Sequence, residues 1–286
     1  MKNKEIKIGI IGQGYVGTAI KIGFEERFQV NTYDKYLKNL STHNSIKSIC
    51  ESSDLIFLCL PTPMNENGSC HLNILDEVLT EINSLTSLEN KIFAIKSTVP
   101  PGSSDNFKVR FKRLNIVYNP EFLREENYLD DFKNQEFIIL GGDKKDIGVI
   151  AGVYQEIFPN IKIIKTETRI AEMSKNLINT FLATKVSFAN EMKLICDKIK
   201  INYNDVIQVA QNDKRLGLTH WDVPGPDSMP GFGGSCFPKD INSIYFFSRS
   251  LNIDCNLIEA AIKTNNQVRP EMDWKKLKGR AVLDNE

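Results

Sequence analysis

The sequence predicts an α/β protein in which an N-terminal Rossmann-type parallel sheet is followed by a long helix and a small all-α domain. Short apolar runs alternate with amphipathic stretches over residues 1–166, which is typical of βαβ units. Beyond them the pattern changes to purely helical spacing. Because 286 residues exceed what one core usually organises, we expect two domains, 1–166 and 167–270, and a C-terminal tail, 271–286.

The predicted strands are short apolar runs bounded by polar or turn-forming residues: 6–11, 29–33, 55–60, 92–96, 116–118, 137–140 and 161–164. Helical patterns lie between several of them: 18–26, 76–85 and 146–158. Strands that are apolar throughout and connected by helices predict a parallel sheet covered on both faces.

A single helix is predicted over residues 168–198, a stretch without glycine or proline. It would be about 45 Å long at 1.5 Å per residue, which exceeds the usual globular range. We therefore expect it to form the spine of the second domain and a homodimer interface. Its apolar residues recur at helical spacing: Ile170, Met173, Leu177, Phe181, Phe188 and Met192. The remaining predictions are shorter helices and one functional Gly- and Pro-rich loop: helices 203–211, 240–250 and 257–267, and loop 216–234.

Composition excludes several classes of function. Lys+Arg and Asp+Glu both number 36, and this balance gives no support to nucleic-acid binding or to a polybasic membrane role. No apolar run approaches the roughly 20 residues of a membrane span, and the N-terminus shows no signal-peptide pattern. The six cysteines have neither CxxC pairing nor zinc-like spacing to the three histidines. We therefore expect no disulfide framework, no metal and a cytoplasmic location.

The segment GQGYVG, residues 12–17, follows the first predicted strand and opens a helical pattern, as a dinucleotide-binding turn requires. Its glycines would make the tight turn, admit a pyrophosphate and allow close helix packing, in the order Gly12, Gly14 and Gly17. Asp34 ends the second strand, where a carboxylate would accept hydrogen bonds from the adenosine ribose and favour NAD. Lys35 beside it could attract a 2′-phosphate, so NADP stays an alternative.

The segment GFGGSCFPKD, residues 231–240, places Cys236 among glycines, with Lys239 and Asp240 close behind it. Glycines let a backbone approach a ligand, a nearby cation favours the reactive thiolate, and a carboxylate can act as general base. The alternative is a buried structural cysteine in a tight turn. The dinucleotide motif at the other end of the chain favours a catalytic role.

Together these segments resemble the UDP-glucose/GDP-mannose dehydrogenase family. The matching pieces occur in the family's order: 12–17 (GQGYVG), 59–63 (CLPTP), 96–102 (KSTVPPG), 119–125 (NPEFLRE), 171–191 (AEMSKNLINTFLATKVSFANE) and 231–240 (GFGGSCFPKD). The resemblance implies an NAD-dependent, four-electron oxidation of a nucleotide sugar's primary alcohol to a carboxylate, with UDP-glucose to UDP-glucuronate as the expected case. It also implies that the first domain binds NAD and that the second carries dimerisation and catalysis.

In the implied chemistry, one hydride transfer gives an aldehyde, Cys236 captures it as a thiohemiacetal, and a second transfer gives a thioester that water hydrolyses. Lys175 and Asn179 are four residues apart, hence on one helix face, and would handle proton removal and oxyanion stabilisation with Asp240. Glu121 would activate the hydrolytic water. The implied catalytic residues are Cys236, Lys175, Asn179, Asp240, Glu121 and Thr98.

The resemblance also implies binding residues. The cofactor contacts would be Gly12, Gly14, Tyr15, Val16, Gly17, Asp34, Lys35, Leu60, Pro61, Thr62, Pro63, Ser97, Thr98, Val99, Glu125 and Lys239. The substrate contacts would be Glu121, Phe122, Leu123, Arg124, Lys175, Asn179, Phe232 and Gly233. They are joined by Arg215, whose counterpart in family dimers reaches the partner subunit's site.

The chain departs from the family in two ways. Family members usually continue into a second Rossmann-like domain that grips the nucleotide, so the chain resembles a short form without it. The loop 215–236 is also longer than usual, and Trp221 within it is predicted to stack on a base or sugar. Two alternatives stay open: a two-electron dehydrogenase of a small hydroxy acid, which would not need Cys236, and a degenerate NAD-binding subunit.

Overall fold

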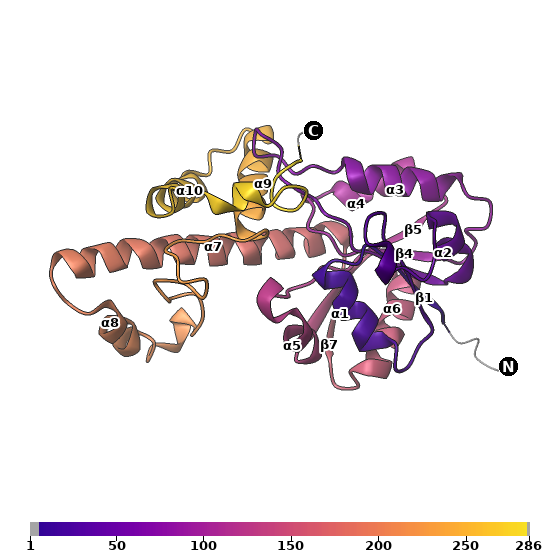
Figure 1. Cartoon of the computed structure of the whole chain (residues 1–286), viewed down its shortest axis with the longest axis horizontal. Helices are drawn as coiled ribbons and strands as arrows, with labels where there is room; N and C mark the ends of the chain where they lie inside the picture. Colours follow the sequence, from indigo (N-terminus) through magenta and orange to yellow (C-terminus); the bar gives the residue numbers. More distant parts are fainter. Residues whose placement is uncertain (1–5, 285–286) are drawn as a thin grey trace. The chain divides into compact units, whose positions relative to one another are not determined.

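The computed structural model describes residues 6–284, and its contacts divide the chain into two compact units. Unit 1 holds the residues up to Thr62 together with Leu72–Lys175, and unit 2 holds Pro63–His71 and the residues from Asn176 onward. The predicted long helix is present as α7, Thr168–Lys198, which is continuous across the boundary (Figure 1). Among residues 6–284, no helix combines the length and apolar character that a membrane span needs.

Unit 1 is built on a seven-stranded sheet with the order β2-β1-β3-β4-β5-β6-β7, which confirms the predicted α/β fold. Every predicted strand is present: β1 Ile8–Ile11, β2 Val30–Tyr33, β3 Leu55–Leu58, β4 Ile92–Ile95, β5 Asn115–Tyr118, β6 Phe137–Gly141 and β7 Lys162–Thr166. The prediction of a parallel sheet is wrong at one place, because β6 runs antiparallel to β5 and pairs with it at Tyr118 and Gly141. Antiparallel neighbours need no helical crossover, and the connection holds only a 3₁₀ turn and a six-residue helix.

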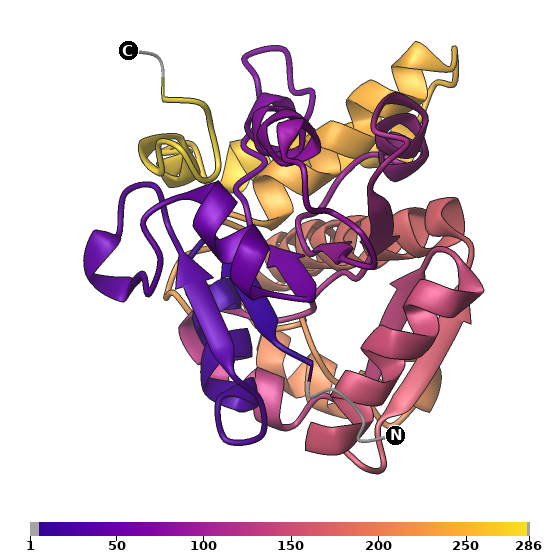
Figure 2. The same cartoon turned by 90° about the vertical axis from the view of Figure 1, so that its right-hand side faces the viewer.

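Helices cover both faces of this sheet (Figures 1 and 2). Apolar side chains of α2, α3 and α4 form one buried cluster with the sheet, and those of α1, α5 and α6 form another. The six helices are α1 Tyr15–Phe24, α2 Ile46–Ser52, α3 Asn73–Ser84, α4 Ser103–Arg110, α5 Tyr128–Lys133 and α6 Lys144–Ile157. Two 3₁₀ turns accompany them: η1 Lys38–Leu40 and η2 Glu125–Asn127.

Unit 2 consists of helices, the long loop that follows η3, and one excursion from earlier in the chain. Its elements after α7 are α8 Tyr203–Ala210, η3 Lys214–Leu216, α9 Phe237–Ser250, α10 Asn256–Val268 and η4 Asp273–Lys276. The excursion is Pro63–His71, which lies far earlier in the chain. Within it Met64 donates its N–H to the carbonyl oxygen of Ala281 (2.9 Å) and accepts from the N–H of Leu283 (3.1 Å).

Trp221 is buried in unit 2, with 7% of its surface exposed. Its ring meets the edge of Phe188, at 6.3 Å between ring centres, and the ammonium of Lys185 lies 4.5 Å from the ring centre. Its Nε1 donates to the carbonyl oxygen of Gly217 (3.0 Å). The prediction that Trp221 stacks on a base or sugar is therefore wrong, because the ring serves as an anchor for its own loop.

Candidate functional site

The turn after β1 has the geometry that the glycine motif predicts. At Gly12 φ is +97°, and a Cβ there would lie 2.2 Å from the carbonyl oxygen of Cys59, so only glycine fits. A Cβ at Gly17 would lie 1.9 Å from the carbonyl oxygen of Gly12, so α1 packs directly on the turn. Gly14 is the N-cap of α1, and a Cβ there would meet nothing within 4 Å. The approach to the first amides of α1 is therefore open to an anion.

Asp34 follows β2, and backbone N–H groups hold its carboxylate. Oδ2 accepts from Gln13 (2.7 Å), and Oδ1 accepts from Tyr36 (2.8 Å) and Leu37 (2.9 Å). These bonds fix the carboxylate beside the glycine turn, while Oδ2 keeps acceptor capacity for a ribose hydroxyl. The neighbouring Lys35 places its ammonium 5.6 Å from the ring centre of Tyr36.

Two hydroxyl groups join the segments that follow β3 and β4. Ser97 Oγ donates to the carbonyl oxygen of Leu60 (2.5 Å), and Thr62 Oγ1 donates to that of Thr98 (2.9 Å). Val99 is fully buried behind them. Other predicted cofactor residues lie on adjoining pieces of chain: Tyr15 and Val16 in the first turn of α1, Pro61 and Pro63 on either side of Thr62, and Glu125 at the start of η2.

A buried carboxylate supports the second of these segments. Glu172 of α7 is completely buried and accepts from the N–H groups of Gly102 (2.6 Å) and Ser104 (2.8 Å). Burial raises the pKa of Glu172, and the hydrogen bonds from Ser104 and Gly102 oppose that shift. Glu172 thereby ties the segment after Thr98 to the helix that carries Lys175.

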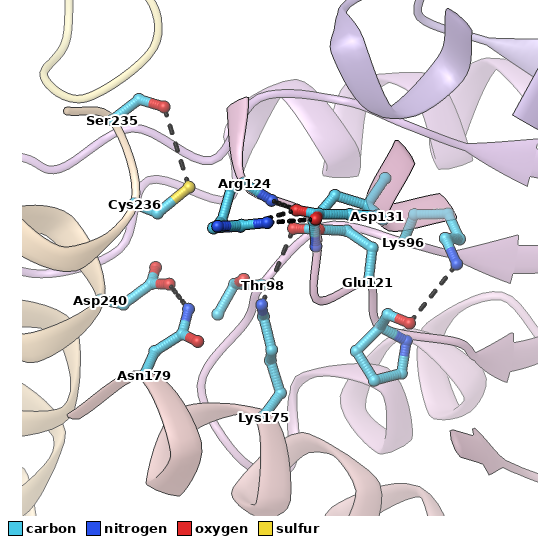
Figure 3. A network of polar contacts seen from close by, with 12 residues as sticks. Lys96, Thr98, Glu121, Arg124, Asp131, Lys175, Asn179, Ser235, Cys236 and Asp240 are labelled. Carbon is cyan, nitrogen blue, oxygen red and sulfur yellow. Dashed lines mark hydrogen bonds and ion pairs between the residues drawn. The ribbon is translucent and has the colours of Figure 1, made fainter. Parts of the chain in front are cut away.

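Lys175 lies close to two predicted substrate residues of unit 1, of which Figure 3 shows Glu121. Its side chain is buried, with Nζ 3.7 Å from Oε1 of Glu121 and 4.8 Å from the ring centre of Phe122. The other oxygen of Glu121 accepts from the N–H of Leu123 (2.5 Å). An amine held between a carboxylate and an aromatic face can bind a substrate oxygen or exchange a proton with it.

Arg124 is engaged by a carboxylate of its own unit. Its Nε and Nη2 donate to Asp131 at 3.0 Å and 2.7 Å, and its backbone N–H donates at 2.8 Å (Figure 3). The side-chain hydrogen bonds from Arg124 lower the pKa of Asp131. This pair fixes the path of the predicted substrate-binding segment 122–124.

A second buried lysine lies behind that segment. Lys96, with 4% of its surface exposed, donates to Asn119 Oδ1 (3.1 Å), to the carbonyl oxygen of Pro120 (3.4 Å) and to Tyr154 Oη (3.3 Å). Tyr154 donates in turn to Asn119 Oδ1 (2.9 Å). All these acceptors are uncharged, and burial lowers the pKa of Lys96 to about 8.

The predicted nucleophile lies in unit 2, at the N-cap of α9. Asp240, in the first turn of α9, is 2% exposed and accepts from Lys239 Nζ. It also accepts from Asn179 Nδ2 at 2.6 Å (Figure 3). Burial alone would lower the pKa of Lys239, but the charges of Asp240 and then Cys236 outweigh it and raise that pKa above its ordinary value. The attraction is mutual, so this permanent cation favours the thiolate of Cys236.

The other residues predicted for unit 2 differ in their surroundings. Phe232 is buried in a small cluster that includes Ala183 and Ile241, and Gly233 follows it. Arg215 is 89% exposed on its side chain and donates through Nε and Nη2 to Asp213. The structure thus assembles two groups of predicted catalytic residues: Thr98, Glu121 and Lys175 in unit 1, and Asn179, Cys236 and Asp240 in unit 2.

Sequence reasoning missed several polar residues that support these groups. Lys96 and Glu172 both lie inside matched family segments, and that position is the one signal that could have pointed to them. Asn265 and Arg269 had no such signal. Across residues 6–284, no three His, Cys, Asp or Glu side chains are arranged to hold a metal ion.

Comparison with protein-family models matches the chain in two parts. Residues 25–161 match the NAD-binding domain of the UDP-glucose/GDP-mannose dehydrogenase family, and residues 169–267 match that family's central domain. The first match supports NAD as the cofactor.

Comparison with individual proteins also finds members of this family. The chain is 34% identical to a UDP-glucose 6-dehydrogenase of Rickettsia conorii, over 82% of this chain and 55% of the relative. It is 31% identical to a putative UDP-glucose 6-dehydrogenase of Bacillus subtilis, over 91% of this chain and 68% of the relative. The solved structure of a UDP-glucose dehydrogenase from Pyrobaculum islandicum matches with a TM-score of 0.84 and 25% identity, over 93% of this chain and 69% of that chain. The chain thus spans about half the length of the first curated relatives it matches.

Proposed function

Because this chain belongs to the UDP-glucose/GDP-mannose dehydrogenase family, we propose that it oxidises the primary alcohol of a nucleotide sugar to a carboxylate, with UDP-glucose to UDP-glucuronate as the leading case. The observation that carries the proposal is the position of Cys236. Cys236 occupies the N-cap position of the 14-residue helix α9, and it interacts electrostatically with Lys239, whose side chain is 13% exposed. Both the helix N-terminus and the ammonium favour a thiolate.

The turn after β1 fits the cofactor. The open side of Gly14 at the N-terminus of α1 would take the pyrophosphate, and Asp34 would take the adenosine ribose. The ordered segments after β3 and β4 would line the remainder. When bound, NAD would accept the hydride in each of the two oxidations.

The protein's own groups would divide the remaining chemistry. The Lys175 amine and the Asn179–Asp240 pair would take the alcohol proton and stabilise the oxyanion. The Cys236 thiolate would then add to the aldehyde carbon, and its sulfur would remain bound as a thioester after the second oxidation. Water activated by Glu121 would cleave the C–S bond, which yields the sugar carboxylate and restores the thiol. The overall change is four electrons per sugar.

We assign the parts of the chain accordingly: residues 1–166 to NAD binding, residues 167–270 to dimerisation and catalysis, and residues 271–286 to a tail. We also propose a cytoplasmic location, because the spacing of the six cysteines does not resemble a disulfide framework.

We also propose a homodimer through α7. Large apolar side chains along this helix are exposed at helical spacing: Ile170, Met173, Leu177, Phe181, Phe188 and Ile195. Such a stripe favours a second copy as its cover, and the exposed Arg215 would serve the partner's site. Phe181→Glu is expected to shift sedimentation from dimer to monomer, whereas the exposed Val109→Glu is not. A wild-type protein that sediments as a monomer would contradict the dimer.

Stoichiometry tests the reaction. The purified protein, given UDP-glucose and NAD, should form two NADH per sugar, and Cys236→Ser should form no carboxylate. One NADH per substrate with an active Cys236→Ser variant would point to a two-electron dehydrogenase instead. NAD binding without turnover on a panel of nucleotide sugars would identify a non-catalytic NAD-binding subunit.

A further inference from the structure

A buried guanidinium supports the glycine-rich segment that leads to Cys236. Arg269 follows α10 and is 2% exposed. Its Nε and Nη2 donate to Asp273 at 2.6 Å and 2.8 Å, and Nη2 lies 2.7 Å from Oδ2 of Asp227. A buried charge with two carboxylate partners is held in one orientation.

The guanidinium lies directly against the backbone of Gly233. A Cβ at this position would be 2.4 Å from Nη2 and 2.5 Å from Cζ of Arg269. A side chain at this position would require Arg269 to move away from the two carboxylates that hold it, so the placed guanidinium requires glycine at residue 233. This close approach gives Gly233 a structural reason that is independent of any substrate contact.

Two buried amides hold the residues just before Gly233. Asn265 Oδ1 accepts from the N–H of Phe232 (2.7 Å), and its Nδ2 donates to the carbonyl oxygen of Phe232 (3.0 Å). Asn190 Oδ1 accepts from the N–H of Gly231 (3.1 Å). The backbone over residues 231–233 is therefore fixed by side chains of α7 and by side chains in and directly after α10.

Only Gly234 and Ser235 separate this fixed backbone from Cys236. Gly234 has φ of +70°, and a Cβ there would meet nothing within 4 Å. Cys236 is thus fixed on one side by α9, whose N-cap position it occupies, and on the other by the backbone of Gly233 against Arg269. Displacement of Arg269 would pass to the sulfur through a linker of two residues.

Asp227 connects this support to the long loop. Two hydrogen bonds close the turn that contains Asp227. Asp227 Oδ1 accepts from the N–H of Met229 (3.1 Å), and Gly225 donates its N–H to the carbonyl oxygen of Met229 (2.9 Å). The buried Trp221 anchors the loop further back. The loop therefore delivers a carboxylate to Arg269 from a fixed position.

We propose that Asp227 and Arg269 are positioning residues for the thiol of Cys236, and that the long loop acts on the reaction through this ion pair. The catalytic part of this inference rests on the proposed function. In this proposal, the long loop 215–236 holds the segment that carries Cys236 in place. A displacement of about 1 Å at a reacting group can slow catalysis by about 100-fold.

The test compares Asp227→Asn with Asp227→Glu and with Asp254→Asn. Asp227→Asn leaves the Arg269–Asp273 pair intact, so the protein should fold. Asp227→Glu keeps the negative charge, so its alkylation rate and turnover should lie close to those of the wild-type protein. Asp254→Asn is the matched control, because it breaks the exposed Arg249–Asp254 ion pair (2.8 Å) in the same unit.

Two readouts separate positioning from general stability. Alkylation of Cys236 by iodoacetamide at pH 7, measured by mass spectrometry against Cys255 in the same digest, should slow about threefold or more in Asp227→Asn, because a displaced thiol loses its thiolate-favouring surroundings. Turnover of UDP-glucose should fall by about tenfold in kcat, with KM and NAD affinity nearly unchanged.

An unchanged or faster alkylation of Cys236 in Asp227→Asn would overturn the inference, as would an equal slowing in Asp254→Asn. Because alkylation needs no turnover, the two proposals fail separately. If wild-type protein oxidises no nucleotide sugar while Asp227→Asn still slows alkylation, the positioning role stands and the proposed reaction falls.

Discussion

Lys96 of unit 1 is buried and the Lys239 side chain of unit 2 is 13% exposed, yet their surroundings shift the two lysine pKa values in opposite directions. Lys96 meets an amide, a carbonyl and a phenol oxygen, and burial lowers its pKa to about 8. Lys239 meets the carboxylate of Asp240, whose charge overcomes the effect of burial and raises the lysine pKa. The difference shows that burial alone does not decide the charge of a lysine. In unit 2 a paired carboxylate keeps the cation permanent beside a thiol, whereas in unit 1 a lysine behind the substrate segment can lose its proton slightly above neutral pH.

The largest effect on stability is expected when the carboxylate of Asp240 is removed, because the two lysines would then both lack a charged partner. Asp240→Asn leaves the largely enclosed ammonium of Lys239 without its paired carboxylate, which should lower the free energy of unfolding by about 3 kcal/mol. Urea unfolding followed by circular dichroism measures the loss. The double variant Lys239→Met with Asp240→Asn should recover part of it, because no buried charge remains. A double variant less stable than Asp240→Asn would contradict the ion-pair explanation.

The pH dependence of stability sharpens the comparison. A lysine whose folded pKa is about 8 binds fewer protons folded than unfolded up to its ordinary value of about 10.4, so its contribution rises with pH through that window and is lost as pH falls through 8. Relative to Lys96→Met, wild-type protein should gain up to about 3 kcal/mol between pH 7 and pH 11.

Lys239 should behave oppositely in the same experiment. Its folded pKa is raised, so its contribution is complete below the unfolded value and is lost only as pH rises through the folded value. Lys239→Met and wild type should therefore keep a constant difference between pH 8 and pH 10. The exposed Lys112→Met serves as the control. Curves for wild type and Lys96→Met that stay parallel would show that Lys96 titrates normally.

The smallest effects are expected from two glycine substitutions in the turn after β1 of unit 1, which test whether this turn binds NAD. Gly14→Ala should keep the thermal midpoint, since its Cβ would meet no atom within 4 Å, but should weaken NAD binding by at least about tenfold, or 1.4 kcal/mol. Gly12→Ala should lower the midpoint as well, because the added Cβ would meet the carbonyl oxygen of Cys59. Isothermal titration with NAD and thermal unfolding measure both. Unweakened NAD binding by Gly14→Ala would exclude the pyrophosphate from this turn.

Apolar patterning was enough to predict all seven strands and the long helix, because short apolar runs and a 31-residue helix leave strong signals. This held even for the edge strand β7, which is largely exposed. The short helices α2, α4 and α5 were missed. Each has six to eight residues, too few for helical periodicity to stand out from a loop. The antiparallel β6 was also missed, because strand direction depends on the path of the connection and leaves no pattern within the strand.

The candidate site was predictable where a residue type carries the chemistry, as at Cys236 or Lys175. It was not predictable where a residue acts through burial. Arg269 has the sequence character of a surface arginine, and only the fold shows it enclosed beside Gly233. The prediction for Trp221 was wrong for the opposite reason. An aromatic residue in a Gly- and Pro-rich loop is a plausible stacking partner for a ligand, and only the structure shows its ring packed against Phe188.

The pairing of Met64 with Ala281 and Leu283 has a consequence for how this polypeptide is made. A ribosome finishes the excursion Pro63–His71 long before it synthesises Ala281 and Leu283, so the backbone of Met64 stays without these two partners until those residues have been made. Contacts of such sequence separation slow folding. Fragments cut after the sheet would carry the same unmet edge, and an exposed edge of this kind invites aggregation. Expression of the sheet alone should therefore include removal or replacement of this excursion.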